Sequence, residues 1–267
     1  MLRKRVITAL CGLPIVSLAV WFDHPLPWFT ILAALWGVLA VLEFYRLVAT
    51  AKVPVLISFG IAWTFVFIVS PHAGHDATLP IILTSGIVFS LIWLVLRSHR
   101  EGAFAGWAWT LAGMLYIGWL MSYLVTLRLE AGRNWVYFAL FTTFASDTAA
   151  YFIGKAFGKH YLAPRISPHK TWEGAVGGIL GAIIIGALFS LSSPISIPVS
   201  MWLAILLGAL VSIFGQFGDL AKSLLKRNAG VKDSGKLLPG HGGVLDRTDS
   251  VIFAGVVVYY AFLFTTG

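Results

Sequence analysis

Residues 79–96 read LPIILTSGIVFSLIWLVL, a run of 18 residues without a charged side chain. As an α-helix this run is about 27 Å long, because each residue adds about 1.5 Å. That length is close to the hydrocarbon thickness of a bilayer, where a spanning helix needs about 20 apolar residues. Polar and apolar residues do not alternate in the run, so it favours a membrane-spanning helix over a strand of a β-barrel.

The rest of the chain repeats this pattern. Of the 267 residues, 58% are hydrophobic and 11% are charged, and the mean hydropathy is +0.87. Soluble domains carry about 25% charged residues, so this composition excludes a disordered chain, a coiled coil and a water-soluble domain. We predict an all-α polytopic membrane protein with about nine transmembrane helices, at 5–22, 26–48, 53–70, 79–96, 104–126, 135–157, 172–192, 197–219 and 250–266.

The basic residues predict the orientation of these helices. With the N-terminus in the cytoplasm, each of the 19 Lys and Arg residues except Arg128 and Arg133 falls in a cytoplasmic segment. This excess of cations on the cytoplasmic side is the usual asymmetry of membrane proteins. It explains the net charge of +8, so we expect no nucleic-acid partner. The single cysteine, Cys11, excludes an internal disulfide.

Polar residues are distributed unevenly along the chain. Residues 1–135 are mostly plain apolar helix, and we expect them to form an N-terminal region of about five spans. Residues 136–267 form the second region, with two cytoplasmic loops at 158–171 and 220–249. Six of the 11 acidic residues lie between positions 147 and 249, interleaved with basic residues. We therefore expect the chemistry at the cytoplasmic face, in this second region.

Asp147 lies inside the predicted span 135–157. A carboxylate there costs about 2.5–3.5 kcal/mol on insertion scales, so it needs a cation or a wet cavity. At helical spacing it shares one face with Tyr151 and Lys155. A structural ion pair with a neighbouring helix is one interpretation, and a functional role is the one we favour, because intramembrane carboxylates are usually functional.

Residues 165–174 read RISPHKTWEG and lead into the next predicted span. Ser167 or Thr171 can cap that helix, with Glu173 in its first turn. This interpretation leaves Lys170 at a helix start, where the partial positive charge disfavours cations unless they share an anion. The alternative is a phosphate site at the helix N-terminus, built with Lys170 and the hydroxyls. The segment alone does not decide between the two.

The end of the predicted span 197–219 carries a polar stripe. If the helix continues past its predicted end, five polar residues fall on one face: Asp219, Lys222, Ser223, Lys226 and Arg227. A solvated interfacial helix with snorkelling cations accounts for the basic residues. It leaves Asp219 at the membrane edge unexplained.

A glycine-rich segment, 232–249, follows and reads KDSGKLLPGHGGVLDRTD. Its backbone N–H groups can form a nest for an anion. Asp246 and Asp249 are spaced i, i+3, so both can face one point. A glycine turn with Asp249 as a helix N-cap is the simpler alternative. It does not account for the other polar residues in the same segment, which include Lys232, Asp233, His241 and Arg247.

Carboxylates and cations therefore gather on one predicted membrane face. Mg²⁺ takes one or two carboxylates together with substrate phosphate oxygens, and Lys and Arg neutralise the remaining phosphate charge. This combination indicates metal-assisted phosphoryl or nucleotidyl transfer. The sequence has no competing Ser-His-Asp order, zinc-ligand pattern or Walker loop, since Gly235-Lys236 lacks both the earlier Gly and the following Ser or Thr of a P-loop.

A 27-residue stretch has a defined pattern: Ser223-x-Leu225-Lys226-Arg227-x4-Lys232-Asp233-x-Gly235-x2-Leu238-Pro239-x-His241-Gly242-Gly243-Val244-x-Asp246-Arg247-Thr248-Asp249. At every defined position it resembles the signature of the phosphatidate cytidylyltransferases, also called CDP-diacylglycerol synthases. The upstream segments around Asp147 and 166–174 also look like that family, except that His169 stands where the family usually shows Lys. The resemblance is strong over about 145–260, and the first five spans match only in length and hydropathy.

The resemblance implies transfer of the cytidylyl group from CTP to phosphatidate, which gives CDP-diacylglycerol and pyrophosphate. The lipid phosphate would attack the α-phosphorus of CTP in line, with Mg²⁺ bound and with room for a second cation. The resemblance also implies a bacterial-type cytoplasmic (inner) membrane, surrounding membrane lipids, an active site that faces the cytoplasm, and a homodimer.

For this reaction we expect Asp219 and Asp246 to hold the metal, with Asp249 as a further ligand or its orienting group. Four cations are expected to stabilise the triphosphate charge: Lys226, Arg227, Lys232 and Arg247. Other substrate contacts are expected from Ser167, Lys170, Thr171, Ser223, Asp233, His241 and, lining the polar cavity, Asp147.

Two other classes compete with this interpretation. An alcohol phosphotransferase that uses a CDP-lipid would carry an Asp-Gly-x2-Ala-Arg signature, whereas Asp219 is followed by Leu220. A secondary transporter for an anionic solute would suit the glycine-rich helices and Asp147. Transporter sites lie near the membrane midplane, however, and these charges cluster at one face.

Overall fold

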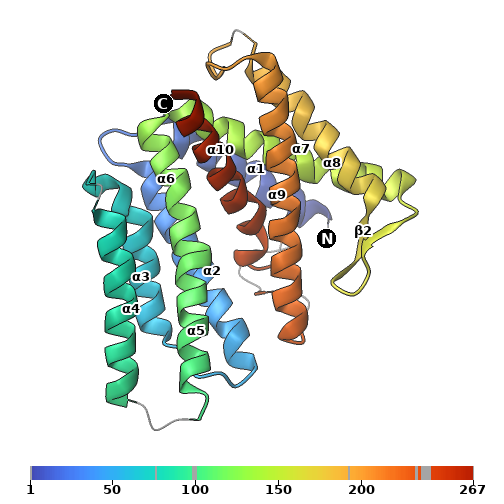
Figure 1. The fold of residues 1–267 in the computed structure, drawn as a ribbon. Helices are drawn as coiled ribbons and strands as arrows, with labels where there is room; N and C mark the ends of the chain where they lie inside the picture. Colours follow the sequence, from blue (N-terminus) through green and yellow to red (C-terminus); the bar gives the residue numbers. More distant parts are fainter. Residues whose placement is uncertain are drawn as a thin grey trace. The chain divides into compact units, whose positions relative to one another are not determined.

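The structure, a computed structural model, describes residues 2–75, 77–97, 101–191, 193–231, 234–235 and 242–266. Its elements are almost all helices, as Figure 1 shows. Within the described ranges the only strands are β1 (Tyr161–Ala163) and β2 (Ser167–Thr171). The helical character predicted from the sequence is therefore confirmed, and the small sheet, inside the predicted loop 158–171, is an addition to it.

The chain forms two compact units, and each is assembled from two stretches of sequence. The first unit comprises residues 1–129 and 228–248, and the second comprises residues 130–227 and 249–267. The glycine-rich segment therefore belongs to the unit of the N-terminal helices, and the chain leaves that unit again just before Asp249.

The first unit is built from helices that follow the first five predicted spans. They are α1 (Leu2–Trp21), α2 (Trp28–Thr50), α3 (Ile57–Val69) with the 3-10 turn η1 (Ser70–Ala73), α4 (Thr78–Arg97), and a continuous run of α5 (Ala103–Gly113), the π-helical segment η2 (Met114–Trp119) and α6 (Leu120–Glu130). A short 3-10 turn, η3 (Leu245–Arg247), comes from the glycine-rich segment.

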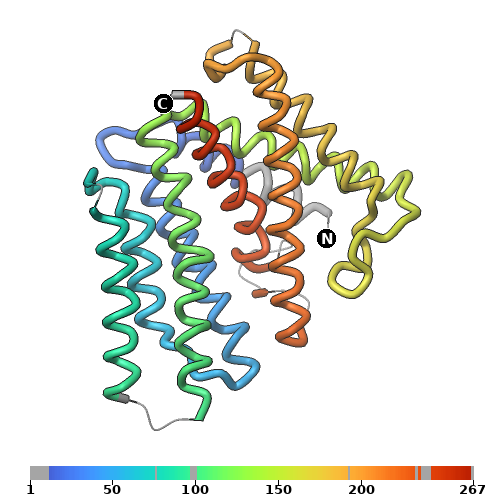
Figure 2. The backbone as a smooth tube through the Cα atoms, viewed as in Figure 1, coloured from blue at the N-terminus to red at the C-terminus, as the bar shows by residue number. Residues whose placement is uncertain are grey.

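The second unit contains the last four predicted spans. Its helices are α7 (Arg133–Phe157), α8 (Trp172–Phe189), α9 (Met201–Asn228) and α10 (Asp249–Thr266), with the two strands between α7 and α8. The backbone trace shows α9 as one uninterrupted helix (Figure 2). It continues nine residues beyond the predicted span end at 219, so the predicted loop 220–249 is shorter than expected.

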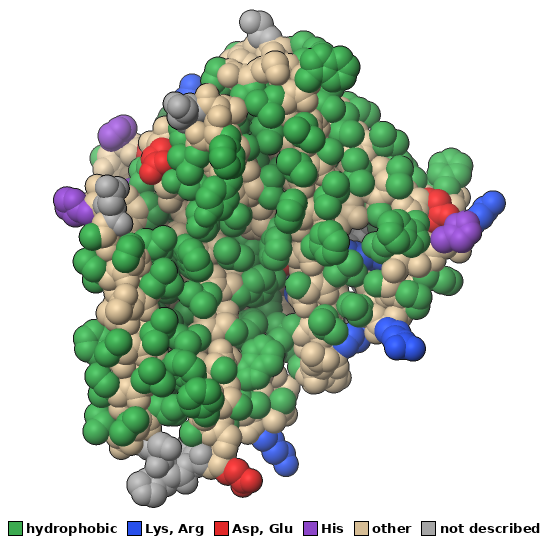
Figure 3. Space-filling model, viewed as in Figure 1, with side chains coloured by type: hydrophobic (Ala, Val, Ile, Leu, Met, Phe, Trp, Pro, Cys, Tyr) green, Lys and Arg blue, Asp and Glu red, His purple; other side chains and the backbone are tan. Residues whose placement is uncertain are grey.

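Within the described residues, six helices are long and apolar enough to cross a membrane: Trp28–Thr50, Thr78–Leu96, Ala103–Glu130, Arg133–Phe157, Trp172–Phe189 and Met201–Asn228. Shorter apolar helices occupy Gly12–Trp21, Ile57–Ala73 and Asp249–Thr265. Large apolar side chains remain exposed, including Trp202 at 79% and Phe264 at 88%, and hydrophobic side chains cover most of the face in Figure 3. Such a surface is that of an integral membrane protein. The count of nine crossings and their orientation stay predictions.

Close helix contacts in the first unit form around Tyr45 of α2, which is fully buried. Its hydroxyl donates to the backbone oxygen of Thr110 at 2.8 Å. Gly60 and Gly113 pack directly against its ring, where a Cβ would overlap the side chain. These contacts join α2, α3 and α5, because the helices approach closely only where side chains are small.

Small residues also set the packing of the second unit. A Cβ on Gly181 would lie 2.6 Å from the Cβ of Ala149, and one on Gly174 would lie 2.9 Å from the backbone oxygen of Ala150. Helix α8 therefore packs closely against α7. Small residues at such contacts let helices approach in a membrane.

Candidate active site

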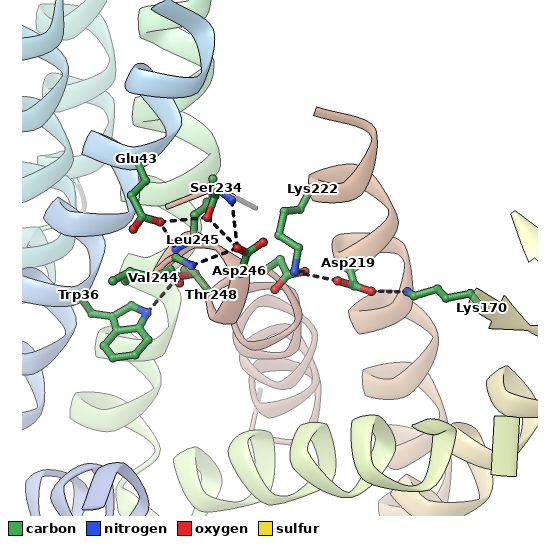
Figure 4. Close-up of polar contacts among 12 residues, drawn as sticks. Trp36, Glu43, Lys170, Asp219, Lys222, Ser234, Val244, Leu245, Asp246 and Thr248 are labelled. Carbon is green, nitrogen blue, oxygen red and sulfur yellow. Dashed lines mark hydrogen bonds and ion pairs between the residues drawn. The ribbon is translucent and has the colours of Figure 1, made fainter. Parts of the chain in front are cut away.

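A network of opposite charges lies within the second unit, on α9, α10 and β2. The ammonium of Lys222 contacts Asp219 Oδ1 at 2.8 Å and Asp249 Oδ2 at 2.7 Å. The ammonium of Lys170 contacts Asp219 Oδ2 at 2.5 Å (Figure 4). We call these four residues the charge network. It brings together three predicted site residues, and it adds Lys222, which the sequence placed on the stripe without a role.

Local structure explains why these side chains meet. Asp219 and Lys222 are spaced i, i+3 on α9, so they lie on one face. Asp249 is the first residue of α10, and α9 approaches it at Gly218, where a Cβ would lie 3.0 Å from the backbone oxygen of Asp249. Lys222 and Asp249 are buried, and buried charges are tolerated when they are paired.

The strands β1 and β2 hold Lys170 in this network. They pair antiparallel, with Tyr161 opposite Thr171 and Ala163 opposite Ser167. The hydroxyl of Thr171 accepts from the backbone N–H of Gly174 at 3.2 Å, so Thr171 is the N-cap of α8. The predicted cap is confirmed for Thr171, while Ser167 begins β2. Because β2 runs directly into α8, the cap fixes the strand that carries Lys170.

Glu173 closes the base of the hairpin. It accepts from the backbone N–H groups of Lys159 at 3.1 Å and His160 at 3.3 Å, and it contacts His160 Nδ1 at 2.6 Å. Arg227 near the end of α9 also binds the hairpin: its Nε donates to the backbone oxygen of Ile166 at 3.2 Å. The hairpin is thus bound at its base and at its turn.

The remaining predicted residues of the second unit lie on α7 and α9. Ser223 and Lys226 are half-buried on α9, one and two turns after Asp219. Asp147 is exposed on α7. Two of the three residues predicted to share a face lie near each other, since the Lys155 ammonium is 5.9 Å from the centre of the Tyr151 ring.

A second polar network lies within the first unit, where α2 meets the glycine-rich segment. Asp246 Oδ2 accepts from the Ser234 backbone N–H at 3.1 Å, the Ser234 hydroxyl at 3.0 Å and the Gly243 N–H at 3.1 Å. Glu43 Oε2 accepts from the Ser234 hydroxyl at 3.0 Å and the Leu245 N–H at 2.9 Å (Figure 4). We call Glu43, Ser234, Gly243, Leu245 and Asp246 the loop network.

Three predicted site residues, Lys232, Asp233 and His241, lie outside the described residues. Arg247 is exposed in η3, next to the half-buried Asp246. The structure therefore joins Asp246 to the glycine-rich segment itself, through backbone N–H groups of the kind that the predicted anion nest requires.

The donor chemistry of both networks fits Mg²⁺, which binds oxygen ligands and takes few carboxylates when phosphate oxygens complete its shell. Asp219 and Asp246 supply such carboxylates. Among the described residues, however, no group of three or more His, Cys, Asp or Glu side chains is arranged to hold a metal. Both oxygens of Asp219 contact ammonium groups, so a metal there would compete with Lys170 and Lys222.

Sequence reasoning gave no role to two residues of these networks, Lys222 and Glu43. The i, i+3 spacing of Asp219 and Lys222 was the available signal for the lysine. For Glu43 the signal was its position inside the predicted span 26–48, which is the same argument that singled out Asp147. Neither signal predicts which residues Lys222 and Glu43 contact, because those contacts depend on the fold.

Comparison with known proteins identifies the family. Residues 3–265 match the model of the cytidylyltransferase family. The chain is 34% identical to the phosphatidate cytidylyltransferase of Bacillus subtilis (strain 168), over 97% of both chains. It is 36% identical to the phosphatidate cytidylyltransferase of Brucella suis biovar 1 (strain 1330), over 97% of this chain and 92% of the relative. The chain therefore belongs to the cytidylyltransferase family, and the protein is a nucleotidyltransferase.

Proposed function

We propose that this protein transfers the cytidylyl group of CTP to phosphatidate, giving CDP-diacylglycerol and pyrophosphate. The similarity to phosphatidate cytidylyltransferases over 97% of the chain carries this proposal. The apolar helices support it, because a lipid substrate must be met at a membrane. The cations of the charge network support it as well, since both substrates are phosphates.

In the proposed reaction an oxygen of the phosphatidate phosphate forms a bond to the α-phosphorus of CTP. The bond from that phosphorus to the oxygen bridging to the β-phosphate breaks in line, and pyrophosphate leaves with the electron pair. The attacking phosphate is already an anion, so no general base is needed. When bound, Mg²⁺, with a second cation if one is used, would supply positive charge against the reacting phosphates.

The carboxylates proposed to hold Mg²⁺ are Asp219 and Asp246, and Asp249 is a further ligand or orients one. In the charge network Lys170 and Lys222 neutralise Asp219. Because a lysine ammonium is a point charge on a flexible stem, we propose that they turn to phosphate oxygens when Asp219 binds the metal. Lys222 also pairs with Asp249, so this exchange keeps the buried charges compensated only if the metal binds Asp249 as well.

Other groups are proposed to bind the phosphates of the two substrates. Thr171 accepts a hydrogen bond as helix cap, so its own O–H proton remains available to a phosphate oxygen. Arg227 uses Nε for Ile166, and its terminal N–H groups are proposed to bind the triphosphate. The remaining proposed contacts are those predicted from the sequence: Asp147, Ser167, Ser223, Lys226, Lys232, Asp233, His241 and Arg247.

The proposed location is a bacterial-type cytoplasmic (inner) membrane, with the site facing the cytoplasm, where a water-soluble nucleotide is available. The bacterial relatives and the distribution of Lys and Arg support this assignment. We also propose a homodimer, on the family resemblance.

The direct test uses purified protein in detergent with phosphatidate, Mg²⁺ and CTP labelled at the α-phosphate. We expect label in CDP-diacylglycerol together with an equal amount of pyrophosphate, and neither product after chelation of divalent cations. Release of CMP in place of pyrophosphate from a CDP-lipid would favour an alcohol phosphotransferase. Solute flux into liposomes without chemical turnover would favour a transporter.

A further inference from the structure

Glu43 is a buried carboxylate on α2 that binds a segment about 200 positions later in the chain. Its side chain is 4% exposed. The same oxygen, Oε2, accepts from the Ser234 hydroxyl and from the Leu245 N–H. These donors lie toward opposite ends of the glycine-rich segment. One carboxylate therefore holds both arms of that segment against the helix.

The hydrogen bonds that Asp246 accepts depend on the same two arms. Three of the groups that donate to it belong to these arms: the Ser234 N–H, the Ser234 hydroxyl, which it shares with Glu43, and the Gly243 N–H. Ser234 is hydrogen-bonded to Glu43, and Gly243 is packed against it, since a Cβ on Gly243 would overlap both Glu43 Oε2 and Ser234 Oγ. A change at Glu43 thus reaches Asp246 through groups that touch both carboxylates.

A second residue of α2 binds the end of the glycine-rich segment. The Trp36 indole N–H donates to the Thr248 hydroxyl at 2.9 Å, and that hydroxyl donates to the Val244 backbone oxygen at 2.8 Å. Trp36 and Glu43 are seven residues apart, so they lie on one face of α2. Two side chains on this face of α2 therefore bind the glycine-rich segment.

The carboxylate is costly in this position. An ionisable side chain inside an apolar helix is costly, and Oε1 of Glu43 is buried without a hydrogen-bond partner among the described residues. An apolar side chain would avoid that cost but could not accept from Ser234 and Leu245. The acid at position 43 therefore serves to bind the glycine-rich segment and not to pack the helix.

We propose that Glu43 is a positioning residue, which acts through Ser234 and Gly243 to hold Asp246 in the geometry that binds Mg²⁺ and CTP. The proposal rests on the proposed function. It assigns a role in the reaction to the N-terminal helices, which contain none of the residues of the family signature.

The test compares Glu43→Leu with Glu43→Gln. The amide oxygen of Gln can still accept both hydrogen bonds, whereas Leu accepts none. We expect Glu43→Leu to lower kcat by about 10–100-fold and to raise the Mg²⁺ concentration for half-maximal rate by a similar factor, as supporting residues of metal sites do. The KM for phosphatidate should change less than about threefold. Glu43→Gln should stay within about threefold of wild type in each quantity.

A structural readout accompanies the kinetics. Hydrogen–deuterium exchange of a peptide covering 242–249 reports the Leu245 N–H that donates to Glu43. We expect faster exchange of this peptide in Glu43→Leu, unchanged exchange of an α8 peptide, and a smaller rise in melting temperature on addition of Mg²⁺ and CTP. Glu101→Leu and Glu101→Gln are the matched controls, because Glu101 is exposed in the same unit.

Two results would overturn the proposal. One is a folded Glu43→Leu protein with normal exchange of 242–249 and normal Mg²⁺ dependence. The other is a Glu43→Gln protein as impaired as Glu43→Leu, because then the charge and not the hydrogen bonds would matter.

If Glu43→Leu does not fold, the back-up variant is Ser234→Ala, which removes the hydroxyl that donates to both Glu43 and Asp246. This variant should shift the Mg²⁺ dependence in the same direction by about threefold to tenfold, and no shift would reject the proposal. If the wild-type protein forms no CDP-diacylglycerol, the proposed function is wrong. The exchange experiment would still test whether Glu43 binds the Leu245 N–H.

Discussion

The two units compensate carboxylates by different means. In the charge network of the second unit, Asp219 and Asp249 are compensated by the ammonium groups of Lys170 and Lys222. In the loop network of the first unit, Glu43 and Asp246 accept from a hydroxyl and from backbone N–H groups. One network is held by charge on long flexible side chains, and the other by neutral donors, most of which belong to the backbone.

This difference indicates different behaviour when phosphates bind. A lysine can leave a carboxylate for a phosphate by rotating its side chain, because both are anions that accept its N–H groups. Backbone donors cannot move without moving the segment that carries them. We therefore expect the charge network to exchange partners during the reaction and the loop network to stay as it is.

The largest effect is expected from the aspartates assigned to the metal. Asp219→Asn and Asp246→Asn should each lower kcat by at least about 10³-fold, because an amide cannot replace the charge of a metal ligand. CDP-diacylglycerol formation measures the loss, with Glu101→Gln as the exposed control. Turnover close to wild type in either variant would remove that residue from the metal role.

Loss of Lys222 should destabilise the second unit. Lys222→Met removes the ammonium between Asp219 and Asp249 and leaves a buried carboxylate that is 2% exposed. Breaking a buried pair in this way costs roughly 3–5 kcal/mol, so the midpoint of denaturant unfolding in detergent should fall clearly. Lys222→Met with Asp249→Asn should recover part of the loss. The exposed Lys159, changed to Met, is the control, and an equal effect there would show that burial of the pair is not the cause.

Crowding of the loop network should have a smaller effect on stability. Gly243→Ala places a methyl group where it overlaps Ser234 Oγ and Glu43 Oε2. Overpacking of this kind costs about 1–3 kcal/mol, and it should also lower activity, because Asp246 accepts from the Gly243 N–H. Gly12→Ala is the matched control, since a Cβ there meets nothing within 4 Å. Similar melting temperatures for the two variants would count against the close packing described for Gly243.

The smallest effect is expected at the exposed end of α9. Arg227→Ala removes the hydrogen bond to the Ile166 backbone oxygen and one cation. Loss of one hydrogen bond from its terminal N–H groups to the triphosphate, worth about 1 kcal/mol, corresponds to about a fivefold rise in the KM for CTP. Arg227→Lys keeps the charge and separates the two contributions. A KM unchanged in both variants would exclude Arg227 from triphosphate binding.

The two networks also differ in how far the sequence could predict them. Part of the charge network follows from local spacing, because Asp219 and Lys222 are neighbours on one helix. The contacts of Lys222 with Asp249 and of Asp219 with Lys170 depend on the fold. The end of α9 was harder to place, since hydropathy falls at Gly218 and Asp219 although the helix continues to Asn228. The strands around Lys170 escaped prediction because they are short and β2 contains Pro168.

The loop network could not be predicted in the same way. Glu43 and Leu245 are 202 positions apart, and no periodicity relates two residues at that distance. The acid in an apolar span was a visible signal, but its partner depends on how α2 packs against η3. Intramembrane acids therefore merit a search for a distant loop, even when the span around them looks plain.

The division of the chain has a consequence for biosynthesis. The first unit is complete only when residues 228–248 have been made, so its N-terminal helices leave the ribosome long before their last segment does. During that interval Glu43 is present in the inserted helix while Ser234 and Leu245 do not yet exist. A protein truncated after α9 would keep this acid without the donors of Ser234 and Leu245, and we expect such chains to be less stable and more readily degraded.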